Sequence, residues 1–127
     1  MVKLRIQGNS LRLRVKRSEL DGFAGSGRIE ETTRFAADER SKLTYVLERS
    51  ADAAAVAIRF DPPVIAVVLP AGLAESWQTG DQTGIYATVD LGPRGTLEVS
   101  VEKDFACLHS DEADNADSFP NPLAARS

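Results

Sequence analysis

The sequence predicts an α+β fold, a mostly antiparallel barrel or sandwich of eight strands with two short helices. Runs of alternating apolar and polar residues recur along most of the chain, and this period of two is typical of half-buried strands. Two short amphipathic segments that end at glycines interrupt these runs and indicate the helices. Because antiparallel strands need protected edges, we expect the sheet to close into a barrel or to pack as two sheets.

Length and composition predict a single domain, which we place at residues 1–109. The chain has 127 residues, of which 43% are hydrophobic, enough for a sizeable core. Its net charge is −4, but residues 1–50 carry 11 Lys/Arg against 7 Asp/Glu, a net +4, and residues 51–127 carry 4 against 12, a net −8. The single cysteine excludes an internal disulfide, and no signal-peptide pattern or apolar run of roughly 20 residues is present. We therefore expect a cytoplasmic protein without a membrane segment.

The first two strands form a hairpin whose two faces differ in charge. Apolar residues alternate with basic residues over residues 2–6 and again over residues 11–16, around a turn that contains Gly8 and Asn9. This arrangement is a strong hairpin signal. Pairing of the two strands gathers the basic residues on one face, which we call the basic face. Its members are Lys3, Arg5, Arg12, Arg14 and Lys16.

A short helix and two more strands complete the first half of the chain. Ser18 is suited to cap a helix over residues 19–24, and the glycine-rich residues 25–27 end it. Residues 28–35 and 43–49 are then expected to be strands, because both alternate in character.

The second half has the same order of elements. The expected strands are residues 55–60, 64–69, 85–91 and the stretch that begins at Thr96. Between the second and third of these strands, Pro70 favours the start of a short helix and Gly80 favours its end. The expected apolar face of this helix consists of Leu73, Ala74 and Trp77.

Residues 1–50 and 55–105 therefore share the order strand-strand-helix-strand-strand, which predicts an internal repeat about an approximate two-fold axis. The alternative is that hairpins and short helices recur by chance in a chain of this size. The anchor residues that match are Val15 with Leu69, Leu20 with Leu73, Phe23 with Trp77, and Ile29 with Ile85.

The basic face carries the leading functional hypothesis. Clustered guanidinium and ammonium groups are suited to an anionic small molecule or to an acidic partner surface, so we expect a binding or interaction protein. Two alternatives remain: the face is only solvated, or it is neutralised by the acidic second half. Neither strand of the hairpin carries an aromatic residue on which a base could stack, so nucleic acid is not the expected partner.

The strand that begins at Thr96 breaks its own pattern near its end. Its alternation would place Lys103 toward the core, which is costly unless the amine is paired or the register shifts. One interpretation is a bulge that turns Lys103 outward to pair with an acidic residue. The other is a small enzyme in which Lys103 acts with Glu102 or Asp104, because ionisable neighbours in a groove shift one another's pKa. Lys103 and Asp104 are therefore candidate ligand-binding residues.

Cys107 and His109 would lie on one face of a continued strand and could share a metal ion. The further ligands would all have to be acidic, since no other Cys or His exists. Alternate residues of a strand lie roughly 6 to 7 Å apart, too far for a Cys–His catalytic pair. We expect a buried small Cys, no metal site and no cofactor.

Residues 110–127 form an acidic tail whose composition cannot bury enough apolar surface to fold alone. We expect part of this tail to be mobile, with Phe119 beside Pro120 as an anchor. The tail is acidic enough to cover the basic face.

Three blocks, LRIQGNSLRLRV near the start and VEKDFACLH and DSFPNP near the end, resemble a family of short bacterial proteins of unknown function. The likeness covers most of the chain, rests on the patterns LRIxGNSLRLR and VEKDFACLH, and implies no activity. The segment VIAVVLPAGLAESWQTGDQTGIYATV is similar to the strand-proline-helix-strand unit of swapped-hairpin transcription factors. That resemblance implies a nucleic-acid-binding regulator as a third hypothesis. This chain departs from those factors by its two units and its net acidic charge.

Overall fold

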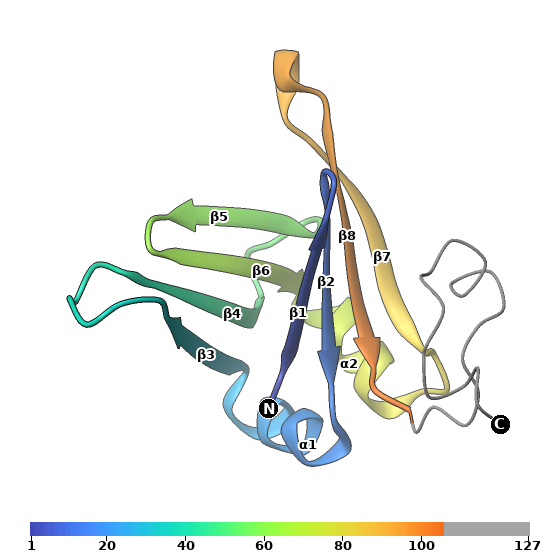
Figure 1. Cartoon of the computed structure of the whole chain (residues 1–127). Helices are drawn as coiled ribbons and strands as arrows, with labels where there is room; N and C mark the ends of the chain where they lie inside the picture. Colours follow the sequence, from blue (N-terminus) through green and yellow to red (C-terminus); the bar gives the residue numbers. More distant parts are fainter. Residues whose placement is uncertain (106–127) are drawn as a thin grey trace, which may run out of the picture.

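The computed structural model describes residues 1–105, which form two four-stranded sheets and two α-helices (Figure 1). Sheet A contains, in spatial order, β1 (Lys3–Gln7), β2 (Ser10–Val15), β8 (Thr96–Lys103) and β7 (Gly84–Asp90). Sheet B contains β3 (Arg28–Arg34), β4 (Lys42–Ser50), β6 (Val64–Pro70) and β5 (Ala57–Asp61). The helices are α1 (Arg17–Ser26), α2 (Ala71–Thr79) and the short 3-10 helix η1 (Gly92–Arg94).

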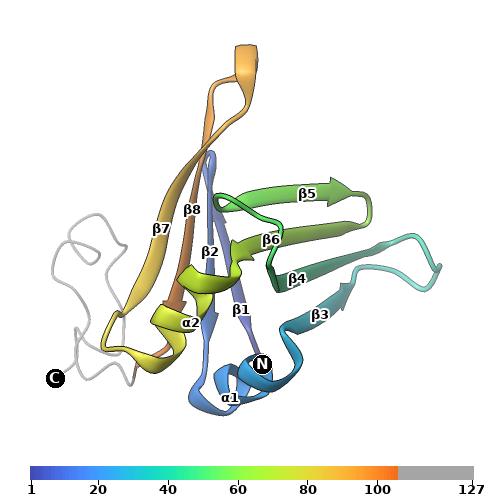
Figure 2. The same cartoon turned by 180° about the vertical axis from the view of Figure 1, so that it is seen from behind.

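The two sheets converge at the end where α1 and α2 lie, and their hairpins extend from it in different directions (Figures 1 and 2). Within residues 1–105, neither α-helix has the length and apolar character that crossing a bilayer requires.

The α+β class and the order of elements agree with the prediction; of the two predicted arrangements, barrel and sandwich, the closed barrel is wrong. Each sheet is mixed: β2 pairs with β8 in parallel and β4 pairs with β6 in parallel, while each outer strand pairs antiparallel. Among the described strands, no ladder joins sheet A to sheet B, so the arrangement is sandwich-like. The sheets are mixed because each one joins a hairpin from the first half of the chain to a hairpin from the second half.

The two sheets have equivalent strand orders. If β1, β2, β7 and β8 are replaced by β5, β6, β3 and β4, the order of sheet A becomes that of sheet B. Val15 pairs with the last residue of β8, and Leu69 takes the equivalent place in the β4–β6 ladder, opposite Arg49. Both α-helices begin two residues after these positions, so Leu20 is equivalent to Ala74 and not to Leu73. The correspondence describes the fold; the origin of the two halves by duplication stays a prediction.

Helix α1 begins earlier than the sequence suggested. Its N-cap is Lys16, not Ser18, and the Lys16 backbone N–H donates to Glu19 Oε1 at 2.8 Å. This bond satisfies one of the backbone donors exposed near the start of a helix. At the other end Gly27 adopts φ 76°, a left-handed conformation that glycine takes without steric cost.

The core is centred on the contact between the two helices. Phe23 of α1 and Trp77 of α2 are both fully buried, and their rings pack edge to face with centroids 6.5 Å apart. Ala74 is also fully buried, whereas Leu73 is 36% exposed and does not belong to the apolar face predicted for it. Leu73 and Ala74 lie four and three residues before Trp77, so either could share its face; the structure buries Ala74 and leaves Leu73 at the edge of that face.

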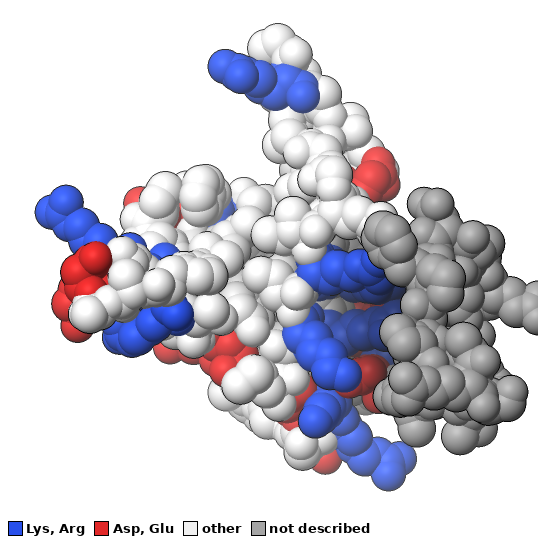
Figure 3. Space-filling view, in the orientation of Figure 1, with Lys and Arg blue, Asp and Glu red and all other residues white. Residues whose placement is uncertain are grey.

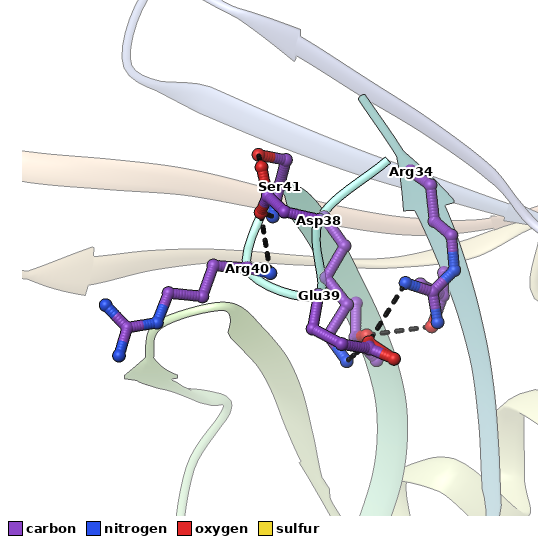
Figure 4. Close-up of polar contacts among 8 residues, drawn as sticks. Arg34, Asp38, Glu39, Arg40 and Ser41 are labelled. Atoms are coloured by element: carbon purple, nitrogen blue, oxygen red, sulfur yellow. Dashed lines mark hydrogen bonds and ion pairs between the residues drawn. The ribbon is translucent and has the colours of Figure 1, made fainter. Parts of the chain in front are cut away.

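The loop between β3 and β4 is held by the carboxylate of Asp38 (Figure 4). This carboxylate accepts hydrogen bonds from the backbone N–H groups of Arg40 and Ser41, both at 2.9 Å, and from the Ser41 hydroxyl at 2.8 Å. The Ser41 hydroxyl contributes most to holding the pKa of Asp38 below its ordinary value. Glu39 in turn pairs with Arg34 at 3.3 Å, which links the loop to the end of β3.

Truncation of Trp77 tests the role of the contact between the helices. Trp77→Ala should lower the free energy of unfolding by about 3–5 kcal/mol, because it removes a fully buried aromatic side chain and leaves a cavity. Leu73→Ala is the matched control on the same helix and should cost less than about 1 kcal/mol. Urea denaturation of both variants measures the difference, and equal losses would contradict the assignment of the buried face.

Candidate functional site

The outer face of sheet A carries the basic residues of the first hairpin. The β1–β2 register sets Lys3 opposite Arg14 and Arg5 opposite Arg12, so these four side chains share one face. Lys16 follows β2 as the N-cap of α1. In Figure 3, Lys and Arg side chains gather over this hairpin with acidic side chains among them. Like charges placed directly opposite one another destabilise a sheet, so this face requires counter-charges.

The required counter-charges come from the end of β8. Glu102 Oε1 lies 3.6 Å from Arg12 Nη1 and 3.5 Å from Arg14 Nε, and Asp104 Oδ2 lies 3.0 Å from Lys3 Nζ. The parallel ladder places Arg14 directly beside Glu102. Two carboxylates of the acidic second half thus offset part of the charge of Lys3, Arg12 and Arg14, in the direction that one of the alternative hypotheses expected.

Glu102 balances charge on this face without using its hydrogen-bonding capacity fully. The Tyr86 hydroxyl donates to Glu102 Oε2 at 2.7 Å, and this bond raises the pKa of Tyr86. Glu102 Oε1 is buried and has no hydrogen-bond partner within residues 1–105, since both guanidinium contacts are too long for direct bonds. The N–H donors of Arg12 and Arg14 therefore remain available to another acceptor.

Gly84 makes room for the contact between Tyr86 and Glu102. It lies opposite Glu102 in the β7–β8 ladder. A Cβ atom at residue 84 would lie 2.9 Å from the Tyr86 hydroxyl oxygen and 3.0 Å from Glu102 Cγ. A larger residue would push this pair apart.

A small hollow of about 140 Å³ lies on the same face beside Arg5 and Arg12. Its polar lining also includes Gln7, Ser10 and Ser100. Among residues 1–105 no carboxylate forms an ion pair with Arg5. The hollow is therefore a local concentration of hydrogen-bond donors with positive charge.

Lys103 lies on the inner row of β8, and the predicted bulge is absent. The ladder runs without interruption to the pair of Val15 with Lys103, and Lys103 Nζ donates to the Gly80 carbonyl at 2.9 Å. Arg49, at the equivalent position of β4, donates to the carbonyls of Phe23 and Ala24, both at 3.0 Å. Each half thus ends its last strand with a cation that satisfies carbonyls at the end of its own helix.

The three adjacent ionisable residues at the end of β8 do not form one cluster. Glu102 and Asp104 contact the basic face, whereas Lys103 reaches the end of α2 on the opposite side of the sheet. Of the groups that the enzyme hypothesis combined, Lys103 and Asp104 line a common cavity at the end of β8, whereas Glu102 does not. Cys107, His109 and the tail of residues 110–127 lie outside the described residues. Within residues 1–105, no three Cys, His, Asp or Glu side chains are grouped as a metal site would require.

Sequence reasoning identified the basic residues but missed Tyr86 and Ser100. Both lie on the outer rows of β7 and β8, and they pair with each other across the ladder. The period-two alternation of these strands placed both residues outward, but nothing local showed that β8 lies beside β2. Only the long-range pairing makes them part of the basic face.

Fold and site define a two-sheet α+β protein with a charged outer sheet face. The model of a family of unknown function (DUF7009) matches residues 2–123, and the chain belongs to this family. No curated protein and no solved structure gives a significant match to the chain. Family membership agrees with the resemblance noted above, while the bacterial origin and the individual sequence blocks stay predictions.

The pair of Lys3 with Asp104 should make stability depend on pH in acid. The Lys3 contact is the main cause that holds the pKa of Asp104 below its ordinary value of 3.8. Because the pKa of Asp104 is lower in the folded state, its ionised carboxylate stabilises the fold at pH values above the unfolded-state pKa. This contribution disappears as the pH falls through the folded-state pKa. Asp104→Asn should therefore unfold at lower urea than the parent at pH 7, and this difference should vanish in strong acid.

Titration of the Asp104 carboxyl by NMR tests directly whether Lys3 lowers its pKa. Lys3→Met should move the pKa of Asp104 back toward its ordinary value, because the ammonium group that stabilises the carboxylate is gone. An Asp104 carboxyl that titrates at or above 3.8 in the parent would contradict the pairing.

Proposed function

We propose that the protein is a binding protein that recognises a small oxyanion on the basic face, at the hollow beside Arg5 and Arg12. The observation that carries the proposal is the direct pairing of Arg5 with Arg12 across the hairpin. Two guanidinium groups at neighbouring positions repel each other unless an anion lies between them or beside them. Arg5 has no such partner among residues 1–105.

The chemistry of the hollow fits a phosphate- or carboxylate-sized group. Guanidinium groups present planar, charge-assisted donors to oxyanions, and the hydroxyl of Ser100 lies in the same lining. The hydroxyl of Ser10 donates to the Gln7 carbonyl at 2.6 Å and so is not a free donor. A volume of about 140 Å³ suits the charged group of a ligand, with the rest of that ligand lying along the sheet. A broad acidic protein surface would contact the whole face and would not need this hollow.

Glu102 acts in this proposal as an internal counter-ion. Its single charge offsets part of the charge of Arg12 and Arg14 without direct hydrogen bonds, so their donors can turn to an incoming anion. The carboxylates of Glu98 and Glu102 also interrupt the positive surface, which favours a small anion over the long polyanion of the nucleic-acid hypothesis. A cytoplasmic location stays a prediction.

Isothermal titration with inorganic phosphate and pyrophosphate at low salt tests the proposal. Arg5→Gln should weaken binding about tenfold, since one charge-assisted contact is lost. Glu102→Gln should strengthen binding, because it removes the internal competitor. The control Arg94→Gln removes the same charge from η1 at the tip of the β7–β8 hairpin and should leave the affinity unchanged. Equal losses in Arg5→Gln and Arg94→Gln, or no binding by the parent, would overturn the proposal.

A further inference from the structure

A second and larger cavity lies at the helical end of the molecule. Its volume is about 600 Å³, within the range of small-molecule sites. Its walls come from the ends of β2 and β8, the first turns of α1 and the end of α2. Val15, Leu20 and Phe105 supply apolar surface. Charged side chains of both signs complete the lining.

The charged side chains of this cavity do not neutralise one another. Arg17 and Lys103 are its cations, and Asp21, Asp81 and Asp104 are its acidic residues; within residues 1–105 no ion pair joins any two of these five, and Asp104 pairs with Lys3 outside the cavity lining. Arg17 and Asp21 are four residues apart on α1, a spacing at which opposite charges meet on one helix face. Lys103 Nζ donates one hydrogen bond to the Gly80 carbonyl. Arg17, Asp21 and Asp81 therefore line the cavity without an ion-pair partner among residues 1–105.

Two of these charges stand at helix ends where they are locally unfavourable. Arg17 is the first residue of α1, where the helix dipole already presents positive potential. Asp81 follows Gly80, the C-cap of α2, where the dipole presents negative potential. Glu19, the acidic residue in the first turn of α1, is occupied by the Lys16 N–H at 2.8 Å and by the Met1 amino group at 2.6 Å. Arg17 thus adds positive charge at the amino end of α1, and Asp81 adds negative charge at the carboxyl end of α2.

Gln78 gives this cavity a polar group that is not charged. The amide nitrogen Nε2 of Gln78 is buried and has no hydrogen-bond partner within residues 1–105, and Gln78 lines this cavity. A buried donor left without an acceptor destabilises the folded protein. An acceptor bound in the cavity would remove that cost.

We propose that this cavity binds a small zwitterion of the amino-acid class, a molecule with one carboxylate and one ammonium group. The carboxylate lies at Arg17, where the amino end of α1 adds favourable potential. The ammonium group lies at Asp81, where the carboxyl end of α2 does the same. Gln78 donates to an oxygen of the ligand, and the aliphatic part of the ligand packs on Val15 and Leu20. This site adjoins the basic face, because Asp104 lines the cavity and pairs with Lys3, but it does not depend on the function proposed for that face.

Matched probes separate a zwitterion site from a simple ion site. Isothermal titration at low salt would compare glycine, 4-aminobutanoate and 6-aminohexanoate with hexanoate and hexylamine, which carry one charge each. At least one amino acid should bind about tenfold or more tightly than either singly charged probe, because it makes both charged contacts at once. Equal binding of a singly charged probe, or no binding by any amino acid, would overturn the proposal.

Variants then assign the two ends of the ligand. Arg17→Gln and Asp81→Asn should each weaken binding of the best amino acid about tenfold. Arg94→Gln and Asp52→Asn remove the same charges from exposed turns away from the cavity and should leave its affinity unchanged. Circular dichroism should show both cavity variants to be folded, since each loses only a charge that its helix end disfavours. Arg5→Gln should not alter this affinity. An unchanged affinity in both cavity variants would contradict the assignment.

Discussion

The parallel pairing of β2 with β8 is the interaction on which the rest of the structure depends. It joins strands from opposite ends of the described chain, in register from Ser10 with Glu98 to Val15 with Lys103. Without it, the β1–β2 hairpin would have no neighbour on one side and its basic residues would have no counter-charges. With it, Glu102 lies beside Arg14 on the outer face. On the inner face the same ladder aligns Leu13 with Val101, and both side chains are almost fully buried.

The same ladder places both candidate sites. On its outer side, β8 contributes Ser100 and Glu102 to the face that the first hairpin began. At its end, Val15 and Lys103 form part of the wall of the larger cavity. Sheet B repeats the arrangement with β4 and β6, but there Glu48 lies 2.6 Å from Arg59, the residue equivalent to Arg5. The two sheets thus share a framework and differ in which arginine has a carboxylate partner, and this difference favours sheet A as the binding surface.

Local patterns in the sequence predicted the strands and helices but not how the strands pair into sheets. Alternation, glycine and proline located every strand and both helices to within a few residues, because hairpins and helix ends depend on neighbours in the chain. The parallel ladders could not be predicted, since no local pattern records which distant strand lies alongside. For that reason the sequence left open a closed barrel beside the two-sheet sandwich. Lys103 was assigned a bulge because its true partner, the Gly80 carbonyl, comes from another element. Leu73 and Ala74 were not separated because a nine-residue helix leaves its phase ambiguous.

The most direct test of this account is the register of the β2–β8 ladder, read from interstrand nuclear Overhauser effects between backbone protons in the folded protein. The structure predicts cross-peaks that link Leu11 with Val99 and Leu13 with Val101. A shift by one residue would link Leu13 with Ser100 or Glu102 and would turn the side chains of β8 to the wrong faces. Cross-peaks of that kind, or the absence of any between β2 and β8, would contradict both the fold and the two sites built on it.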